Sequence, residues 1–220
     1  PLCFMLIYVF MFGYVFKSDE QYFAIFVFIG ITMWDFFNRC LLQSVRVIKS
    51  NKPIVSKVYI PKFILVIIRM CINGFKMFIS FLIVAVMLIV WRVPITWNIL
   101  YCIPILLTLF MLVFGFGCFL LHYGVFVEDL GNVLNIALRL IFYLTGVFWN
   151  IMDRLPAPYN AYIGKGNPIA FLLTSLRECL IYGQTPHRKL LLAWFLIGLV
   201  ISIIGIRKIY KNENSYVKVI

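Results

Sequence analysis

Long apolar runs alternate with short polar segments along this chain. The runs cover residues 1–16, 22–48, 62–91, 97–123, 132–152 and 190–206. Because a transmembrane helix needs about 20 mainly apolar residues, each run is a candidate span, although the first is short for one. The pattern predicts an all-α, polytopic membrane protein with six transmembrane helices, organised as a single domain over residues 1–220.

The segment from Asp153 to Lys189 breaks this alternation with clustered prolines and glycines. Within it, Asn167 and Pro168 open an apolar run that stops at Gly183. Asn at the N-cap, Pro at the first helical position and Gly beyond the end mark both ends of a helix. About fifteen helical residues span about 22 Å, which is too short to cross a membrane comfortably. The sequence therefore predicts short re-entrant or interfacial helices before the last span.

Lysine and arginine give the chain a formal net charge of +12. Basic residues cluster between the second and third runs and after the last run, at Arg46, Lys49, Lys52, Lys57, Lys62, Arg207, Lys208, Lys211 and Lys218. Cytosolic segments of membrane proteins carry an excess of Lys and Arg. With six spans both groups lie on the same side, so we expect both termini in the cytosol. Nucleic-acid binding is disfavoured because the basic residues mostly bracket apolar runs.

Composition supports a membrane domain and gives no sign of an enzyme. The chain is 64% hydrophobic and 13% charged, whereas soluble domains average about 25% charged residues. Its cysteines are scattered, which argues against a metal site or a disulfide framework. Gly164-Lys-Gly166 lacks the remaining Gly and the Ser/Thr of a phosphate-binding P-loop. We therefore predict no catalytic, metal, cofactor or ATP site in this chain.

Three of the apolar runs carry polar residues at helical spacing. These candidate pathway-lining residues are Asp35, Arg39, Arg69, Asn73, Lys76, Asn135 and Arg139. Ionisable residues at membrane depth usually face a protein interior or a water-filled path, so one hypothesis is a path for an anionic, hydroxyl-rich substrate. The other is that the residues satisfy one another between packed helices, as Asp35 and Arg39 could at four-residue spacing.

A family resemblance accounts for the basic segment between the second and third runs. Asn51-Lys-Pro-Ile-Val-Ser-Lys57-Val-Tyr59-Ile-Pro61-Lys62 resembles a segment of the ABC-2-type permeases that export polysaccharides, including O-antigen, capsule and teichoic acid exporters. Further similar segments follow in the order of the family, at Gly30–Phe37, Phe114–Gly117, Phe126–Leu130, Phe142–Phe148 and Asn167–Pro168 with Arg177. Two positions depart from the family pattern: Glu128 replaces an arginine and Gly146 replaces a proline.

The resemblance implies the permease subunit of an ATP-driven exporter in the bacterial cytoplasmic membrane. The cargo would be a polysaccharide on a lipid diphosphate carrier, moved by a homodimer of this chain with two copies of a separate ABC ATPase that binds ATP and Mg²⁺. The chain itself would bind no cofactor. The family pattern also implies that an N-terminal amphipathic helix and the start of the first span precede Pro1.

The resemblance assigns roles to two groups of residues. An ATPase-coupling loop, with a second contact after the fourth span, would comprise Asn51, Lys52, Lys57, Tyr59, Pro61, Lys62 and Asp129. Short helices at the outer mouth would include Trp149, Asn167, Pro168 and Arg177. Two other functions remain open: an ABC-2 exporter of drugs or small lipids, and a membrane-embedded enzyme acting on polyprenyl or lipid substrates. Such enzymes usually carry clustered acidic or histidine residues, and here Glu128 and Asp129 stand alone.

Overall fold

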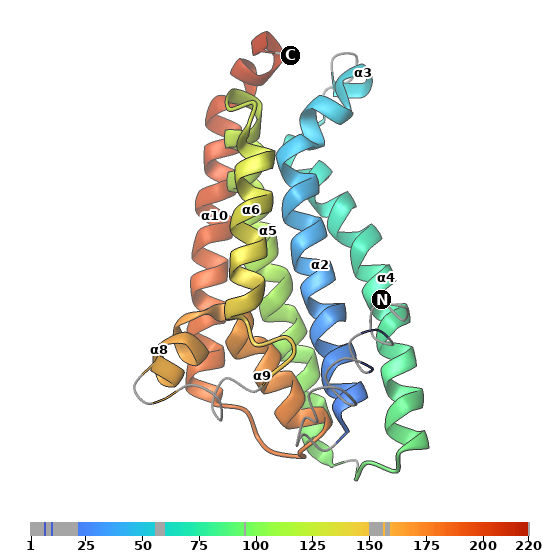
Figure 1. The fold of residues 1–220 in the computed structure, drawn as a ribbon. Coiled ribbons are helices and arrows are strands. Elements are labelled where there is room, and N and C mark those ends of the chain that lie inside the picture. The colour runs from blue at the N-terminus through green and yellow to red at the C-terminus, as the bar shows by residue number, and fades with distance from the viewer. Residues whose placement is uncertain are drawn as a thin grey trace. The chain divides into compact units, whose positions relative to one another are not determined.

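All regular structure in the described part of the chain is helical, as predicted. The computed structural model describes residues 22–55, 60–94, 96–149 and 159–219, together with residues 7, 10 and 156 (Figure 1). Its elements are α2 (Phe23–Ser50), α3 (Lys52–Val55), α4 (Lys62–Val90), η2 (Trp97–Tyr101), α5 (Cys102–Phe126), α6 (Leu130–Leu144), α8 (Tyr159–Gly166), α9 (Pro168–Leu180) and α10 (Arg188–Val219).

Among the described residues, four helical segments are long and apolar enough to cross a membrane. They are Phe23–Ser50, Lys62–Val90, Trp97–Phe126 and Arg188–Glu213. These correspond to the second, third, fourth and sixth predicted spans, which confirms a multi-pass membrane protein. The predicted count of six is not confirmed. The first run lies outside the described residues apart from Ile7 and Phe10, and the fifth forms a helix of only 15 residues.

Two helix ends differ from the prediction. Helix α6 ends at Leu144, well before Met152, because Gly146 adopts a left-handed φ of 67° that breaks the helix. Helix α10 continues to Val219, whereas the sequence pattern indicated a polar tail after Ile206. No Gly or Pro follows Gly205 in the sequence, so nothing in the local chemistry stops this helix.

The structure divides into two compact units. The first unit takes in Pro1–Asp35, Lys76–Leu106 and Ile141–Leu191, and the second takes in Phe36–Phe75, Leu107–Leu140 and Leu192–Ile220. In the first unit, α9 is mostly buried and begins as predicted. The side chain of Asn167 accepts hydrogen bonds from the backbone N–H groups of Ile169 (3.1 Å) and Ala170 (3.4 Å), and Pro168 follows it at the first helical position.

In the second unit, glycines allow helices to pack closely. A Cβ on Gly124 of α5 would overlap the backbone carbonyl of Val45 on α2. A Cβ on Gly205 of α10 would lie 2.8 Å from Cβ of Cys118 on α5. Small residues at such crossings are typical of membrane helices, whose association depends on close van der Waals contact. These contacts fix α2 and α10 against α5, and α2 carries most of the candidate site.

Candidate functional site

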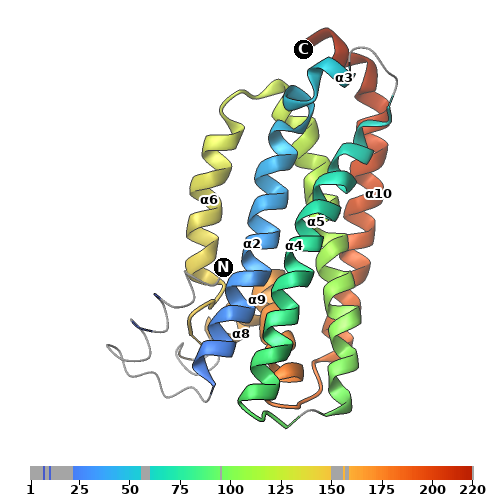
Figure 2. The same cartoon turned by 90° about the vertical axis from the view of Figure 1, so that its right-hand side faces the viewer.

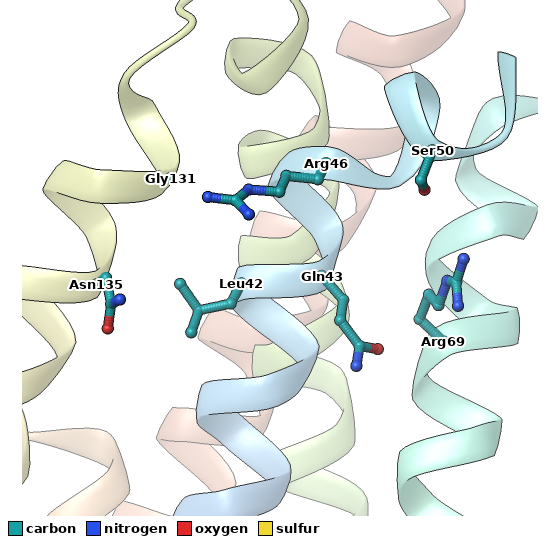
Figure 3. A pocket seen from close by; sticks show the side chains of 7 residues that line it. All are labelled: Leu42, Gln43, Arg46, Ser50, Arg69, Gly131 and Asn135. Atoms are coloured by element: carbon teal, nitrogen blue, oxygen red, sulfur yellow. The ribbon is translucent and has the colours of Figure 1, made fainter.

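An open cavity of about 400 Å³ in the second unit gathers polar side chains from α2, α4 and α6. Its lining residues are Leu42, Gln43, Arg46, Ser50, Arg69, Gly131 and Asn135. Figure 3 shows the α2 residues between Arg69 on α4 and Asn135 on α6. Gln43, Arg46 and Ser50 follow one another at steps of three and four, so they share one face of α2. The cavity therefore arises where a polar face of α2 meets two neighbouring helices.

The cavity is electropositive. Two arginines line it, and none of its seven lining residues is acidic. A Cβ on Gly131 would lie 3.2 Å from Nε and from one terminal nitrogen of Arg46, so the guanidinium rests on the first turn of α6. Arg46 and Arg69 therefore give the cavity the donors to bind an anion with several acceptor oxygens, such as a phosphate or a carboxylate.

A second cavity of about 380 Å³ adjoins the first, since both are lined by Arg46 and Ser50. Its other lining residues are Val45, Lys49, Gly124 and Glu128. Glu128 stands where the resembling family has arginine. The substitution places a carboxylate beside the basic residues of this second cavity, while the first keeps its two arginines and no acid. Of the two cavities, the one with Arg69 and Asn135 is therefore the better candidate for binding an anion.

The structure brings two of the predicted pathway-lining residues together in the first cavity, Arg69 and Asn135. Asn73 is buried beside it, where its Nδ2 donates to Oε1 of Gln43 (2.8 Å) and to the backbone carbonyl of Arg69 (2.9 Å). Asn73 thus joins α2 to α4 and positions Gln43. For this residue the structure favours the packing hypothesis over direct contact with a substrate.

Four predicted lining residues are not among the residues that line this cavity. Arg39, Lys76 and Arg139 are exposed and Asp35 is half-buried. Conversely, the predicted lining set omitted Gln43, Arg46, Ser50 and Gly131. The spacing of Gln43, Arg46 and Ser50 along α2 was the available signal. This spacing is ambiguous in the sequence, because Arg46 can equally be the first residue of a basic loop that sets the membrane orientation.

The described part of the coupling loop contains exposed and anchored residues. Asn51 donates from Nδ2 to the carbonyl of Val47 (2.7 Å) and so closes the end of α2. Lys52 is exposed at the start of α3, and Asp129 is exposed just before α6. Pro61 is half-buried, whereas Lys62 is buried at 2% exposure. Lys57 and Tyr59 lie outside the described residues.

Comparison with known proteins decides the family. The pattern of the ABC-2 type transporter family matches residues 1–181 of the chain. The chain belongs to the ABC-2 type transporter family. Two curated relatives, both O-antigen export system permease proteins RfbA from Klebsiella pneumoniae, are 21% and 22% identical over 222 residues, covering 100% of this chain and 84% of each relative. The resemblance inferred from the motifs is confirmed, and the chain is a membrane-spanning transport subunit.

In this ABC-2 transporter, one predicted outer-mouth residue, Arg177, is buried and bonded to two other segments of the first unit. The Arg177 side chain is 4% exposed, and its guanidinium lies 3.4 Å from the centre of the Phe26 ring. It donates to the carbonyls of Phe26 (3.0 and 3.2 Å), Gly146 (2.9 Å) and Val147 (2.6 Å). It therefore ties α9 to α2 and to the turn after α6.

Two glycines of the family-like motifs lie next to this arginine: Gly30 leaves space for it, and Gly146 accepts a hydrogen bond from it. A Cβ on Gly30 would lie 2.6 Å from a terminal nitrogen of Arg177. Gly146 has a φ of 67°, which the ring of a proline excludes, so the family's proline does not fit the turn formed here. Near this turn, Nδ2 of Asn167 lies 3.4 Å from Oγ1 of Thr145, and Trp149 is half-buried. The loss of the proline is thus accompanied by a defined glycine turn.

Proposed function

We propose that this chain is the permease subunit of an ATP-driven exporter that moves a lipid-diphosphate-linked polysaccharide across the bacterial cytoplasmic membrane. The observation that carries the substrate class is similarity over the whole chain to two O-antigen export permeases. The family membership supports a transport role, and the electropositive cavity supports an anionic cargo.

The proposal includes a homodimer of this chain with two copies of a separate ABC ATPase, which binds the ATP and Mg²⁺. Both termini lie in the cytosol, on the side of the loop between α2 and α4, because cytosolic segments are enriched in Lys and Arg. The ATPase contacts would be Asn51, Lys52, Lys57, Tyr59, Pro61 and Asp129. The exposure of Lys52 and Asp129 in the second unit supports this role, since both are accessible to a partner.

The cavity with Arg46 and Arg69 would hold the diphosphate of the carrier lipid. Arginine suits this chemistry because its planar guanidinium donates two parallel hydrogen bonds to phosphate oxygens. Gln43, Ser50 and Asn135 add neutral donors beside the arginines. In this mechanism the cavity recognises the carrier's charge, so polymers of different sugars can share one entry site.

Export itself provides the test of the function. Deleting the gene from its own host should leave the lipid-linked polymer inside the cell, where a glycan-specific antibody detects it only after permeabilisation. Re-expression of the chain with its ATPase should return the polymer to the cell surface. Normal surface polymer in the deletion strain would refute the proposal, and a defect confined to drug efflux would favour a small-molecule exporter instead.

Neutralising the cavity should weaken cargo binding. In Arg46→Gln and Arg69→Gln we expect the lipid-linked polymer concentration for half-maximal stimulation of ATPase activity to rise by about 10- to 100-fold, because each lost charge-assisted hydrogen bond contributes about 1.5–3 kcal/mol. The measurement is a titration of the purified complex. Arg188→Gln is the matched control, since Arg188 is exposed at the start of α10 and is not among the residues that line the cavity. Unchanged half-maximal concentrations in both cavity variants would contradict this assignment.

Alanine at both Lys57 and Tyr59 should separate ATP hydrolysis from export. The family resemblance places both residues in the coupling loop, so their loss should leave membrane insertion intact. The amount of polymer exported per ATP hydrolysed should fall by about tenfold, which corresponds to a typical coupling free energy between two sites. Parallel export and ATPase assays on the reconstituted complex measure this ratio. If the variant is instead inverted or degraded, the segment is an orientation signal and not a coupling element.

A further inference from the structure

Lys62 leaves the coupling loop pointing inward. It is the first residue of α4, and although it borders a loop expected to meet the ATPase, its side chain is only 2% exposed. Its Nζ lies 3.3 Å from Oε1 of Glu213 on α10 and donates to the backbone carbonyl of Ile60 at 3.0 Å. Lysine is rarely buried unless it is paired. One cation thus connects the last residues of the loop to the far end of the chain.

The surrounding contacts join the same helices. Figure 2 shows the start of α4 beside the C-terminal part of α10. The rings of Phe63 and Tyr210 lie 5.7 Å apart. On α5, Nδ1 of His122 lies 2.8 Å from the hydroxyl of the fully buried Tyr216. Burial raises the pKa of the Tyr216 phenol, so the hydroxyl remains protonated. The last turns of α10 therefore pack against both α4 and α5.

The length of α10 places these turns beyond the membrane core. The helix has 32 residues, or about 48 Å at 1.5 Å per residue, against a hydrocarbon core of about 30 Å. The part apolar enough to span the membrane ends at Glu213. The ion pair between Lys62 and Glu213 thus lies at the end of the candidate span Arg188–Glu213, where the coupling loop enters α4. The burial of Tyr216 and of the ion pair shows that this end of α10 is packed against other helices and is not a solvated polar tail.

We propose that residues 207–216 of α10 form a brace that carries the movement of the coupling loop into α4, with Lys62 and Glu213 as its positioning residues. The inference rests on the proposed ATP-driven function. Because Lys62 holds both the Ile60 carbonyl and Glu213, displacement of the loop by the ATPase moves the loop backbone, the first turn of α4 and α10 together. Lys62 therefore acts inside the permease, and the ATPase surface is left to the exposed loop residues.

A purely structural ion pair would behave differently from a brace. Breaking a buried pair by removing one partner is strongly destabilising, but replacing both partners with apolar residues is often neutral or stabilising. The double variant Lys62→Met/Glu213→Leu should therefore fold, while it lacks the cation that holds the Ile60 carbonyl. The brace predicts that this variant assembles with its ATPase and hydrolyses ATP but transmits little movement to α4.

The experiment follows α4 directly and needs no cargo. Cys71 is exposed on α4, so its rate of modification by N-ethylmaleimide reports on this helix in a variant that retains it as the sole cysteine. ATP with vanadate should change this rate in the otherwise unaltered complex. The change should shrink by about tenfold in Lys62→Met/Glu213→Leu, in line with typical coupling energies. Lys189→Met, at an exposed position on α10 outside residues 207–216, should behave like the unaltered complex.

Two results would overturn the brace. One is an undiminished nucleotide-dependent change at Cys71 in the double variant, which would leave the pair with a folding role alone. The other is the absence of any nucleotide-dependent change at Cys71 in the unaltered complex. If the complex shows the expected Cys71 response but does not export the polymer, the polysaccharide cargo is refuted and the brace is not. The two results are separable because Cys71 modification is measured without polymer.

Discussion

Replacing Arg177 with alanine is expected to lower the free energy of unfolding by about 3–5 kcal/mol, because each buried polar group left unpaired costs about 1–3 kcal/mol. The guanidinium satisfies the carbonyls of Gly146 and Val147, which lie beyond the end of α6 and outside its hydrogen-bond pattern. It also packs on the Phe26 ring. The thermal transition of the purified protein in detergent and the protein level in the membrane both measure the loss.

Arg188→Ala is the matched control for this prediction. Arg188 is also an arginine over an aromatic ring, 5.2 Å from the centre of Tyr101, but it is exposed. A cation–π contact at an exposed site contributes only about 0.5–1 kcal/mol. Arg177→Lys should resemble Arg177→Ala, because an ammonium cannot reproduce the fork of the guanidinium over several carbonyls. A normal thermal transition in both Arg177 variants would refute the anchoring role.

Local signals in the sequence were sufficient for the long helices and for α9. Apolar runs located the four candidate spans because length and hydropathy are sufficient to identify such helices. Asn167, Pro168 and Gly183 defined α9 because capping depends on residues within a few positions of the helix end. The family resemblance, carried by several weak motifs, was also confirmed over most of the chain.

Contacts between residues far apart in the sequence could not be predicted from the pattern of apolar and polar positions. The early end of α6 depends on Gly146 adopting a left-handed φ while Arg177 binds its carbonyl, and no periodicity in residues 132–152 indicates this. The sequence indicates that Lys62 is one more cation of the basic loop, whereas the structure pairs it with Glu213. For the same reason, only Arg69 and Asn135 of the seven described residues that line the candidate cavity were predicted. Helical spacing assigns residues to a face, but it does not say which faces meet.

Replacing Gly124 with alanine is expected to separate α2 from α5 and to lower the free energy of unfolding by about 3 kcal/mol, at the upper end of typical overpacking costs. The new Cβ would overlap the carbonyl oxygen of Val45 and lie 2.9 Å from its Cα. These are backbone atoms, so no rotamer change relieves the clash. Val45 and Gly124 line the second cavity, which shares Arg46 and Ser50 with the first. The shift should therefore displace Arg46 and also weaken cargo-stimulated ATPase activity.

Gly166→Ala is the control for Gly124→Ala, because it adds the same methyl group to a helix at a position where no clash results. Gly166 ends α8, and a Cβ there would meet no atom within 4 Å. Alanine has a higher helix propensity than glycine by about 1 kcal/mol, so this variant should be as stable as the parent or slightly more stable. Thermal transitions in detergent compare the two variants directly. Equal stability of Gly124→Ala and Gly166→Ala would mean that α2 and α5 do not approach as closely as described, so their contact would not hold Arg46 in place beside the first cavity.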